Sequence, residues 1–238
     1  MSYRIETYPT RLIDVWTLAD GRRVTLRPVL PQDAELEQAL VRALSPASRY
    51  QRFFTPIREL PADWLQRMTQ IDYHRHQALI VESFSGEQAI AVAEARFVVD
   101  ESGQQGEFAV VVADDWQRLG LARRLLESLM RSAAEEGLQR LVGDVLATNR
   151  AMLALARGLG FRVLPHPDGG AQIVRVQRDL QALRGALLEP APGRAAPVDT
   201  LRAAAVAAVR AAPVNAVRAA AVAALRAAPV TAAPAAME

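Results

Sequence analysis

The chain has 238 residues with a hydrophobic content of 51%, which is enough for one large domain or for a domain with an appendage. It contains no cysteine, so disulfides and thiolate catalysis are excluded. Its net charge of +2 is too small to indicate nucleic-acid binding.

Hydrophobic periodicity and turn residues divide residues 12–178 into a mixed α/β pattern. Pro61 marks the start of one helix and Gly160 the end of another. In chain order, we expect strands over 12–18 and 22–27, a helix opened by 28–34 that ends near 44, helices over 45–54 and 61–70, strands over 77–84, 89–99 and 108–112, a helix over 121–133, a strand over 140–146, a helix over 149–159, and strands over 161–164 and 171–178.

After about residue 188 the composition changes, because aromatic residues disappear and Ala, Pro, Val and Arg dominate. A 16-residue unit occupies 196–211 and repeats at 212–227. Isolated helices of this length are marginal in water. We therefore expect a domain over 1–182 and a flexible tail over 183–238. A tail that docks on a partner or drives oligomerisation, and one that binds DNA, are the alternatives.

Targeting and metal signals are weak. The N-terminal segment is broken by charges and has no apolar signal-peptide core, and no segment is apolar over enough length to span a bilayer. We therefore expect a cytoplasmic protein with no membrane partner.

His74 and His76 could suggest a metal site, but the absence of cysteine and of a nearby third ligand favours no metal. His166 lies between two prolines, and we expect it to be exposed.

The stretch over 107–137 organises the chain. It begins with an apolar, β-branched strand and ends with a helix whose apolar residues recur at helical spacing. The turn between them contains Gly120, where a ligand can approach the backbone. Because the first amides of a helix lack internal partners and the helix dipole adds positive charge there, this arrangement predicts an anion site that best suits a pyrophosphate. Arg118, Arg123 and Arg124 can add positive charge.

The loop Gln117-Arg118-Leu119-Gly120-Leu121-Ala122 resembles the acetyl-CoA loop, Gln/Arg-x-x-Gly-x-Gly/Ala, of the GNAT N-acetyltransferase superfamily. It matches neither a Walker loop nor a dinucleotide loop, and an ordinary βα turn is the alternative. The resemblance implies acetyl-CoA as acyl donor and an α/β (mixed α+β) GNAT fold, with helices around a central mixed sheet whose splayed strand pair admits the pantetheine arm. The residues then expected to contact the cofactor are Val110, Val111, Val112, Gln117, Arg118, Leu119, Gly120, Leu121, Ala122, Arg123 and Asn149.

Acetyl transfer to an amine needs a base, because a lysine amine with a pKa of about 10.4 is mostly protonated at neutral pH. Glu107 is the candidate, since it starts the strand that leads into the loop, and partial burial would strengthen it as a base. A solvated carboxylate at a strand end is the alternative reading. Glu94, on the preceding strand, is the second candidate. The amides of Val110 to Val112 would hold pantetheine or polarise the thioester carbonyl.

Asn149 opens the segment Asn-Arg-Ala-Met-Leu-Ala-Leu-Ala-Arg-Gly-Leu-Gly-Phe, which resembles the second GNAT signature. Its side chain either caps the helix that follows or contacts the cofactor. Many members of the superfamily carry a tyrosine, the acid that reprotonates the CoA thiolate, where this chain has Ala156. A low-pKa thiolate would then leave unassisted or through water.

A narrower resemblance covers about residues 10–180. The segments VTLRPVLPQDAEL, SPASRYQRFFTPIREL and GEFAVVVADDWQRLGLARRLLESL look like the acetyltransferase domain of bacterial Pat-type protein lysine acetyltransferases. This implies a protein partner with a target lysine, such as an acyl-CoA synthetase, and Glu107 as the catalytic base. Acetylation of a small amine, a non-catalytic acyl-CoA sensor and a scaffold acting through the tail are the alternatives. The sequence leaves the oligomeric state open.

Overall fold

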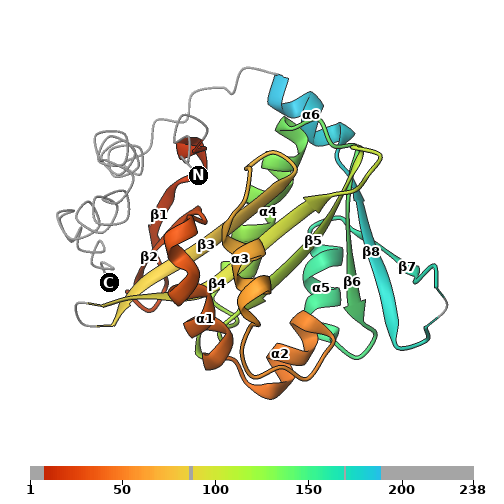
Figure 1. Cartoon of the computed structure of the whole chain (residues 1–238). Helices are drawn as coiled ribbons and strands as arrows, with labels where there is room; N and C mark the ends of the chain where they lie inside the picture. The colour runs from red at the N-terminus through yellow and green to blue at the C-terminus, as the bar shows by residue number, and fades with distance from the viewer. Residues whose placement is uncertain (1–7, 86–87, 169, 189–238) are drawn as a thin grey trace, which may run out of the picture.

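A computed structural model describes residues 8–85, 88–168 and 170–188. These residues build one eight-stranded sheet with helices on both faces (Figure 1). The strands lie in the order β1-β2-β3-β4-β5-β6-β8-β7. All neighbouring strands are antiparallel except β5 and β6, which are parallel. The predicted mixed α/β class is therefore confirmed.

The predicted strands and helices are all present, with ends that differ by up to a few residues. The elements are η2 (Thr10–Leu12), β1 (Asp14–Thr17), β2 (Arg23–Pro28), η3 (Pro31–Asp33), α1 (Ala34–Ala43), α2 (Pro46–Phe53), α3 (Ala62–Thr69), β3 (His76–Ser85), β4 (Gln88–Val99), β5 (Gln105–Val112), η4 (Asp114–Trp116), α4 (Leu121–Glu135), β6 (Arg140–Leu146), α5 (Arg150–Gly158), β7 (Arg162–Pro165), β8 (Ile173–Asp179) and α6 (Gln181–Leu188).

Helix α6 adds to the predicted pattern. Its Leu183 packs against the main hydrophobic core, and the helix contacts α4. Packed structure thus extends past residue 182, where we expected the tail to begin. The repeats at 196–227 lie outside the described residues.

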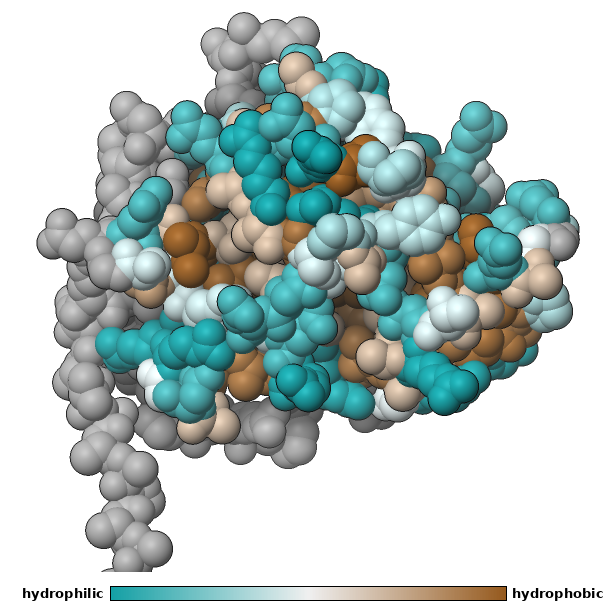
Figure 2. Space-filling view, turned by 90° about the horizontal axis from the view of Figure 1, so that it is seen from below, coloured by the Kyte–Doolittle hydropathy of each residue, from teal (hydrophilic) through white to brown (hydrophobic). Residues whose placement is uncertain are grey.

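The two faces of the sheet are covered by different helices. Helices α4 and α5 lie on one face, where the main core includes Leu125 and Leu129 of α4 and Phe108 of β5 (Figure 1). Helices α1, α2 and α3 lie on the other face, where Leu40 of α1 packs with Val111 of β5. Helices α1, α4 and α5 bury apolar residues against the sheet, as their periodicity predicts. Seen from below, the molecule is largely hydrophilic, with hydrophobic surface between the polar groups (Figure 2).

Strands β5 and β6 separate partway along their length. They pair only from Gln105↔Arg140 to Glu107↔Val142, whereas β5 stays paired with β4 as far as Val112. The ring of Phe108 lies against Gly143 at the point of separation, and a Cβ on that glycine would come within 2.7 Å of the ring. The edge of β5 beyond Glu107 is therefore not hydrogen-bonded to β6, which confirms the predicted splayed strand pair.

Candidate active site

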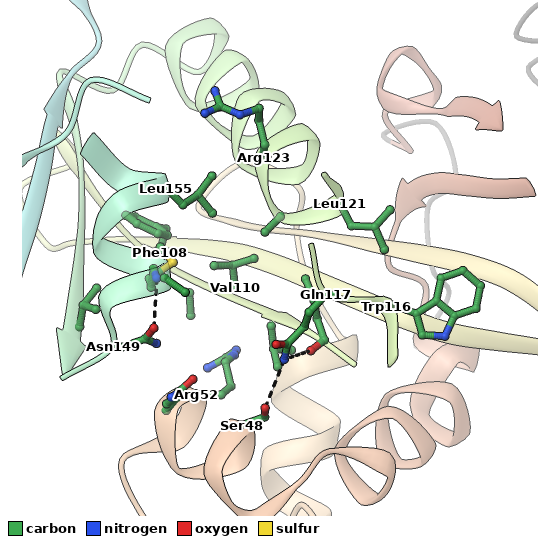
Figure 3. A pocket seen from close by; sticks show the side chains of 18 of the residues that line it. Ser48, Arg52, Phe108, Val110, Trp116, Gln117, Leu121, Arg123, Asn149 and Leu155 are labelled. Carbon is green, nitrogen blue, oxygen red and sulfur yellow. Dashed lines mark hydrogen bonds between the residues drawn. The ribbon is translucent and has the colours of Figure 1, made fainter. Parts of the chain in front are cut away.

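A pocket of about 540 Å³ opens where β5 and β6 separate (Figure 3). Its walls come from β5, the loop before α4, the first turns of α4 and α5, and α2. Glu107 and the residues expected to contact the cofactor all line this pocket, except Leu119, which packs against the core instead. Segments more than 100 residues apart in the chain thus meet at one cavity.

The loop before α4 has the geometry of an anion site. Gly120 is the N-cap of α4 with a φ of 83° and makes no side-chain cap. Arg118 also has a positive φ, 64°. Left-handed residues in such a loop turn amides towards one concavity, and the first amides of α4 lack internal acceptors. Leu121, the first residue of α4, lines the pocket, and its side chain is buried in the core.

Gln117 and Asp114 fix this loop in place. The Nε2 of Gln117 donates to the carbonyl oxygen of Val112 at 3.2 Å and to Oγ of Ser48 at 3.4 Å (Figure 3). Asp114 accepts from the amide and the hydroxyl of Ser45, both at 2.8 Å, and from Oγ of Ser48 at 2.8 Å. The loop is therefore tied to β5 on one side and to α2 on the other.

Two of the three predicted basic residues remain at the pocket. Arg118 and Arg123 line it and are exposed. The expectation is wrong for Arg124, whose Nη2 and Nε reach Asp14 of β1 at 2.6 and 2.9 Å. Its guanidinium also lies 4.2 Å above the ring of Trp16. Arg124 therefore joins α4 to β1 and does not line the pocket.

The register of β4 and β5 decides which amides of β5 are free. The amide of Ala113 donates to Val92, and Glu94 pairs with Val111. Because amides alternate sides in an antiparallel pair, the Val111 amide faces β4, while those of Val110 and Val112 face the gap. The expectation that all three valine amides are available is thus wrong for Val111.

Glu107 lies at the point where β5 and β6 separate, which we call the fork. It is the last residue of β5 that pairs with β6, and it lines the pocket. On its other side it pairs with Val98 of β4. The side chain of Glu107 is exposed, so the expected partial burial is wrong. A base at this position is accessible both from the pocket and from solvent.

Glu94, the second candidate base, is buried in an ion cluster. Its carboxylate accepts from Nε of Arg96 at 2.5 Å and from Nη2 of Arg52 at 3.3 Å. Arg96 also donates to Glu37 at 3.3 Å, and burial together with the charge of Glu94 raises the pKa of Glu37 to about 8. Glu94 thus forms buried ion pairs and does not line the pocket, whereas Arg52 does (Figure 3).

Asn149 caps α5. Its Oδ1 accepts from the amide of Met152 at 3.0 Å, as an N-cap residue should. The same residue lines the pocket (Figure 3). The cap is therefore present, and the position is compatible with a ligand contact as well.

One expectation about a histidine outside the predicted site is wrong. His166 is not exposed as expected, because its side chain is only 14% accessible and its Nε2 lies 3.0 Å from Asp144. Asp144 lines the pocket beside the fork. No local motif marks this pair, because the turn after β7 brings His166 to Asp144 on β6, 22 residues earlier in the chain.

The histidines predicted not to bind metal have other partners. His74 contacts Glu136 at 2.9 Å. His76 lies 3.2 Å from Nη1 of Arg96, and burial together with that cation lowers its pKa to about 4. Within the described ranges, no group of three His, Cys, Asp or Glu side chains is placed to hold a metal ion. No helix there is long and apolar enough to cross a membrane.

A mixed sheet with a splayed parallel pair, and a helix N-terminus beside the gap, defines an acyl-CoA N-acyltransferase fold. The model of the "Acetyltransferase (GNAT) family" matches residues 44–161. The chain is 34% identical over 163 residues to acetyltransferase PA5475 of Pseudomonas aeruginosa, covering 68% of this chain and 88% of that protein. The chain belongs to the GNAT acetyltransferase family.

Other relatives include proteins named Pat. Acetyltransferase Pat of Mycolicibacterium smegmatis is 32% identical over 141 residues, which is 59% of this chain but only 41% of that protein. The GNAT domain of S. lividans PAT superposes with a TM-score of 0.65 at 27% identity, covering 72% of this chain and 99% of that one. The yncA structure from Salmonella typhimurium, solved with acetyl-CoA, shares the fold with a TM-score of 0.54 at 18% identity, covering 72% of this chain and 99% of that one.

Proposed function

We propose that this enzyme transfers the acetyl group of acetyl-CoA to lysine side chains of proteins such as acyl-CoA synthetases, with Glu107 as the general base. The observation that carries the proposal is the place of Glu107. It stands at the fork of β5 and β6, on the wall of the pocket that follows the free edge of β5. We further propose a cytoplasmic location, where acetyl-CoA and such acceptors meet.

The donor would lie along the free edge of β5. The amides of Val110 and Val112 face the gap and suit the amide and carbonyl groups of pantetheine. The pyrophosphate would bind the first amides of α4 at residues 121–123, with positive charge from Arg118 and Arg123. The side chain of Gln117 would hold the loop in position through its bond to Val112.

Glu107 would remove one proton from the incoming ammonium group, directly or through water. The neutral amine nitrogen then forms a bond to the thioester carbonyl carbon, and the tetrahedral intermediate collapses with cleavage of the carbon–sulfur bond. Ala156 is fully buried and has no proton to donate. The CoA thiolate would therefore leave as the anion or take its proton from water.

A protein acceptor fits the exposure of the base. Glu107 is exposed, and its neighbour Val98 has 48% of its surface accessible, as one of the two large hydrophobic residues found exposed in the described structure. A side chain carried on a protein surface can reach such a site without entering a closed cavity. The similarity to Pat proteins supports the same acceptor class.

The test is acetyl transfer from radiolabelled acetyl-CoA to a purified acyl-CoA synthetase, with and without its catalytic lysine. We expect label that depends on that lysine. Glu107→Gln should keep acetyl-CoA binding in calorimetry but lower turnover by about 10² or more, as for loss of a general base. Glu101→Gln, an exposed carboxylate in the turn before β5, is the matched control and should be unaffected.

Each other result has a defined meaning. An unchanged rate in Glu107→Gln would remove this residue from the mechanism. Label on a polyamine or an aminoglycoside, but on no protein, would instead establish a small-amine acetyltransferase. Tight acetyl-CoA binding without transfer to any amine would indicate an acyl-CoA sensor.

A further inference from the structure

Residues from both faces of the sheet line the pocket. Side chains alternate along a strand, and Phe108 of β5 lies in the core with residues of α4 and α5, whereas Val111 packs with α1. Glu107, Ala109 and Val111 therefore face α1 and α2, on the opposite side of the sheet from α4. Arg52 of α2 lines the pocket on this second side.

Arg52 points into the pocket from α2 (Figure 3), yet its side chain is only 11% exposed. A guanidinium carries five N–H donors. Among the described residues, the only hydrogen-bond acceptor of this one is Glu94, which lies 3.3 Å from Nη2, and Nε is buried with no acceptor at all. Because Glu94 pairs with Val111, the guanidinium lies beside the last residues of β5.

Arg27 shows how a buried arginine is satisfied elsewhere in this protein. Its side chain is fully buried, and it donates twice to Asp33, at 2.6 and 2.8 Å, and twice to Glu82, at 3.1 and 2.6 Å. A further bond at 3.0 Å reaches the carbonyl oxygen of Pro28. A buried donor without an acceptor is costly, so the under-bonded Arg52 needs a further partner. Its guanidinium borders a cavity, and a ligand in that cavity can supply the acceptor.

The buried cluster that contains Arg52 has more positive than negative charge. Glu94 is shared between Arg52 and Arg96, whose Nε donates to it at 2.5 Å. The second carboxylate is Glu37, 3.3 Å from Nη2 of Arg96, and because its pKa is raised to about 8 by burial and by the charge of Glu94, it mostly keeps its proton at neutral pH. His76, whose pKa is lowered to about 4 by burial and by Arg96, is neutral there. Two guanidinium charges thus face one carboxylate charge.

Glu107 and Asp144 also line the pocket, but neither balances this charge. Glu107 lies four residues before Val111, which corresponds to about 13 Å along a strand. Asp144 already accepts from Nε of Arg175 at 2.9 Å. Ala109 lines the pocket between Glu107 and Val111, and its small side chain leaves room for a ligand beside the guanidinium.

We propose that Arg52 is a specificity-determining residue that anchors a carboxylate-binding subsite on the Glu107 side of the pocket. A planar guanidinium suits a carboxylate because it can donate two parallel hydrogen bonds. The carboxylate would be the end of a short dicarboxylic acyl group on CoA, such as malonyl or succinyl, or an acidic residue next to the acceptor lysine. The second source rests on the function proposed above, whereas the first requires only that the pocket binds acyl-CoA.

The donor arm of the test is calorimetry of the full-length protein with two unreactive thioethers, S-(3-carboxypropyl)-CoA and its neutral carboxamide analogue. If the acyl group carries the carboxylate, the wild type should bind the charged analogue about tenfold more tightly, as expected for a charge-assisted hydrogen bond shielded from water. Arg52→Met should remove this preference, and Arg52→Lys should keep part of it because the charge remains but the planar fork is lost. Arg67→Met, at an exposed position on α3, is the matched control and should behave as the wild type.

The acceptor arm titrates lysine peptides, with Asp or Asn beside the lysine, into the protein saturated with CoA. A preference for the Asp peptide that disappears in Arg52→Met would assign the carboxylate to the acceptor. No preference for the charged probe in either arm, or a preference that survives in Arg52→Met, would overturn the proposal. The wild-type comparison of charged and neutral probes decides the matter if thermal melts show that Arg52→Met is unfolded. Both readouts are binding, so they keep their meaning even if Glu107→Gln retains full turnover and the proposed base is wrong.

Discussion

The side chain of Gln117 donates to the carbonyl oxygen of Val112 across 3.2 Å, so the loop before α4 is hydrogen-bonded to the end of the strand whose free edge lines the pocket. Val112 is the last residue of β5, and its carbonyl faces the gap left by β6. The bond couples the position of the proposed pyrophosphate loop to that of the proposed pantetheine strand. The side chain of Gln117 therefore links the two parts of the site proposed for one donor molecule.

Gln117→Ala should weaken acetyl-CoA binding roughly fivefold, because it removes a hydrogen bond worth about 1 kcal/mol that orders the loop. Calorimetry with acetyl-CoA measures the effect. Gln66→Ala, at an exposed position on α3, is the matched control. Equal affinities for both variants would show that the bond does not order the loop.

Gly120→Ala should lower both the melting temperature and the affinity for acetyl-CoA. Gly120 has a φ of 83°, and a Cβ there would meet nothing within 4 Å, so the cost of about 1–2 kcal/mol is one of backbone conformation. Gly103 has a similar φ of 72° and equally open surroundings, but lies in the β4–β5 turn. Gly103→Ala should therefore lower stability alone. A normal affinity in Gly120→Ala would argue against an anion site at this loop.

Gly143→Ala should destabilise the fork by about 1–3 kcal/mol, as overpacking does. Its Cβ would lie 2.7 Å from the ring of Phe108. The double variant Phe108→Leu/Gly143→Ala should recover part of the loss, because the smaller side chain makes room for the new methyl group. Denaturant unfolding of Gly143→Ala, Phe108→Leu and the double variant gives a double-mutant cycle. If the changes in free energy of unfolding are strictly additive, the two residues do not interact.

His76 should make stability fall as the solution is acidified. Burial and Arg96 lower its pKa in the folded protein to about 4, whereas the unfolded chain has the ordinary value of about 6.5. Between these values the unfolded chain binds a proton that the folded protein does not, so this contribution to stability is complete above pH 6.5 and is lost as the pH falls towards 4.

The variant His76→Gln should flatten the stability profile between pH 6.5 and 4, measured by urea unfolding at a series of pH values. His74→Gln is the control, because the side chain of His74 is exposed. A slope that persists in His76→Gln but disappears in His74→Gln would contradict the assignment.

Truncation after Leu188 should leave acetyl-CoA binding and acetyl transfer unchanged if residues 189–238 form a separate tail, as we propose. The pocket is lined by residues between 48 and 155, far from that point in the chain. Steady-state kinetics and light scattering of the full and truncated chains provide the comparison. A change in oligomeric state alone would support a docking tail, and a loss of turnover would place part of the active site beyond residue 188.

Several features of this protein follow from its sequence alone. The strand over 108–112 and the helix from Leu121 were predictable because their hydrophobic periods are strong and uninterrupted. The turn at Gly120 was predictable because a glycine between such elements marks a special backbone conformation. The resemblance of this segment to GNAT enzymes then indicated the family, since the motif and the local structure agree.

Other features depended on tertiary structure, because they involve partners far apart in the chain. Arg124 looked like a third cation for the loop until β1 supplied Asp14, 110 residues away. Glu94 looked like a base until α2 and Arg96 enclosed it. Period-2 alternation shows which side chains of a strand share a face, but only the register with β4 shows that the amide of Val111 points away from the gap.

The sequence by itself therefore determined the elements, their order and the anion-binding turn, because these arise from interactions between near neighbours in the chain. The tertiary structure alone decided that Glu107 stands exposed at a fork and that Asp144 and His166 meet beside it. Those relationships are set by strand pairing and by the turn after β7, whose closure depends on packing of the whole sheet.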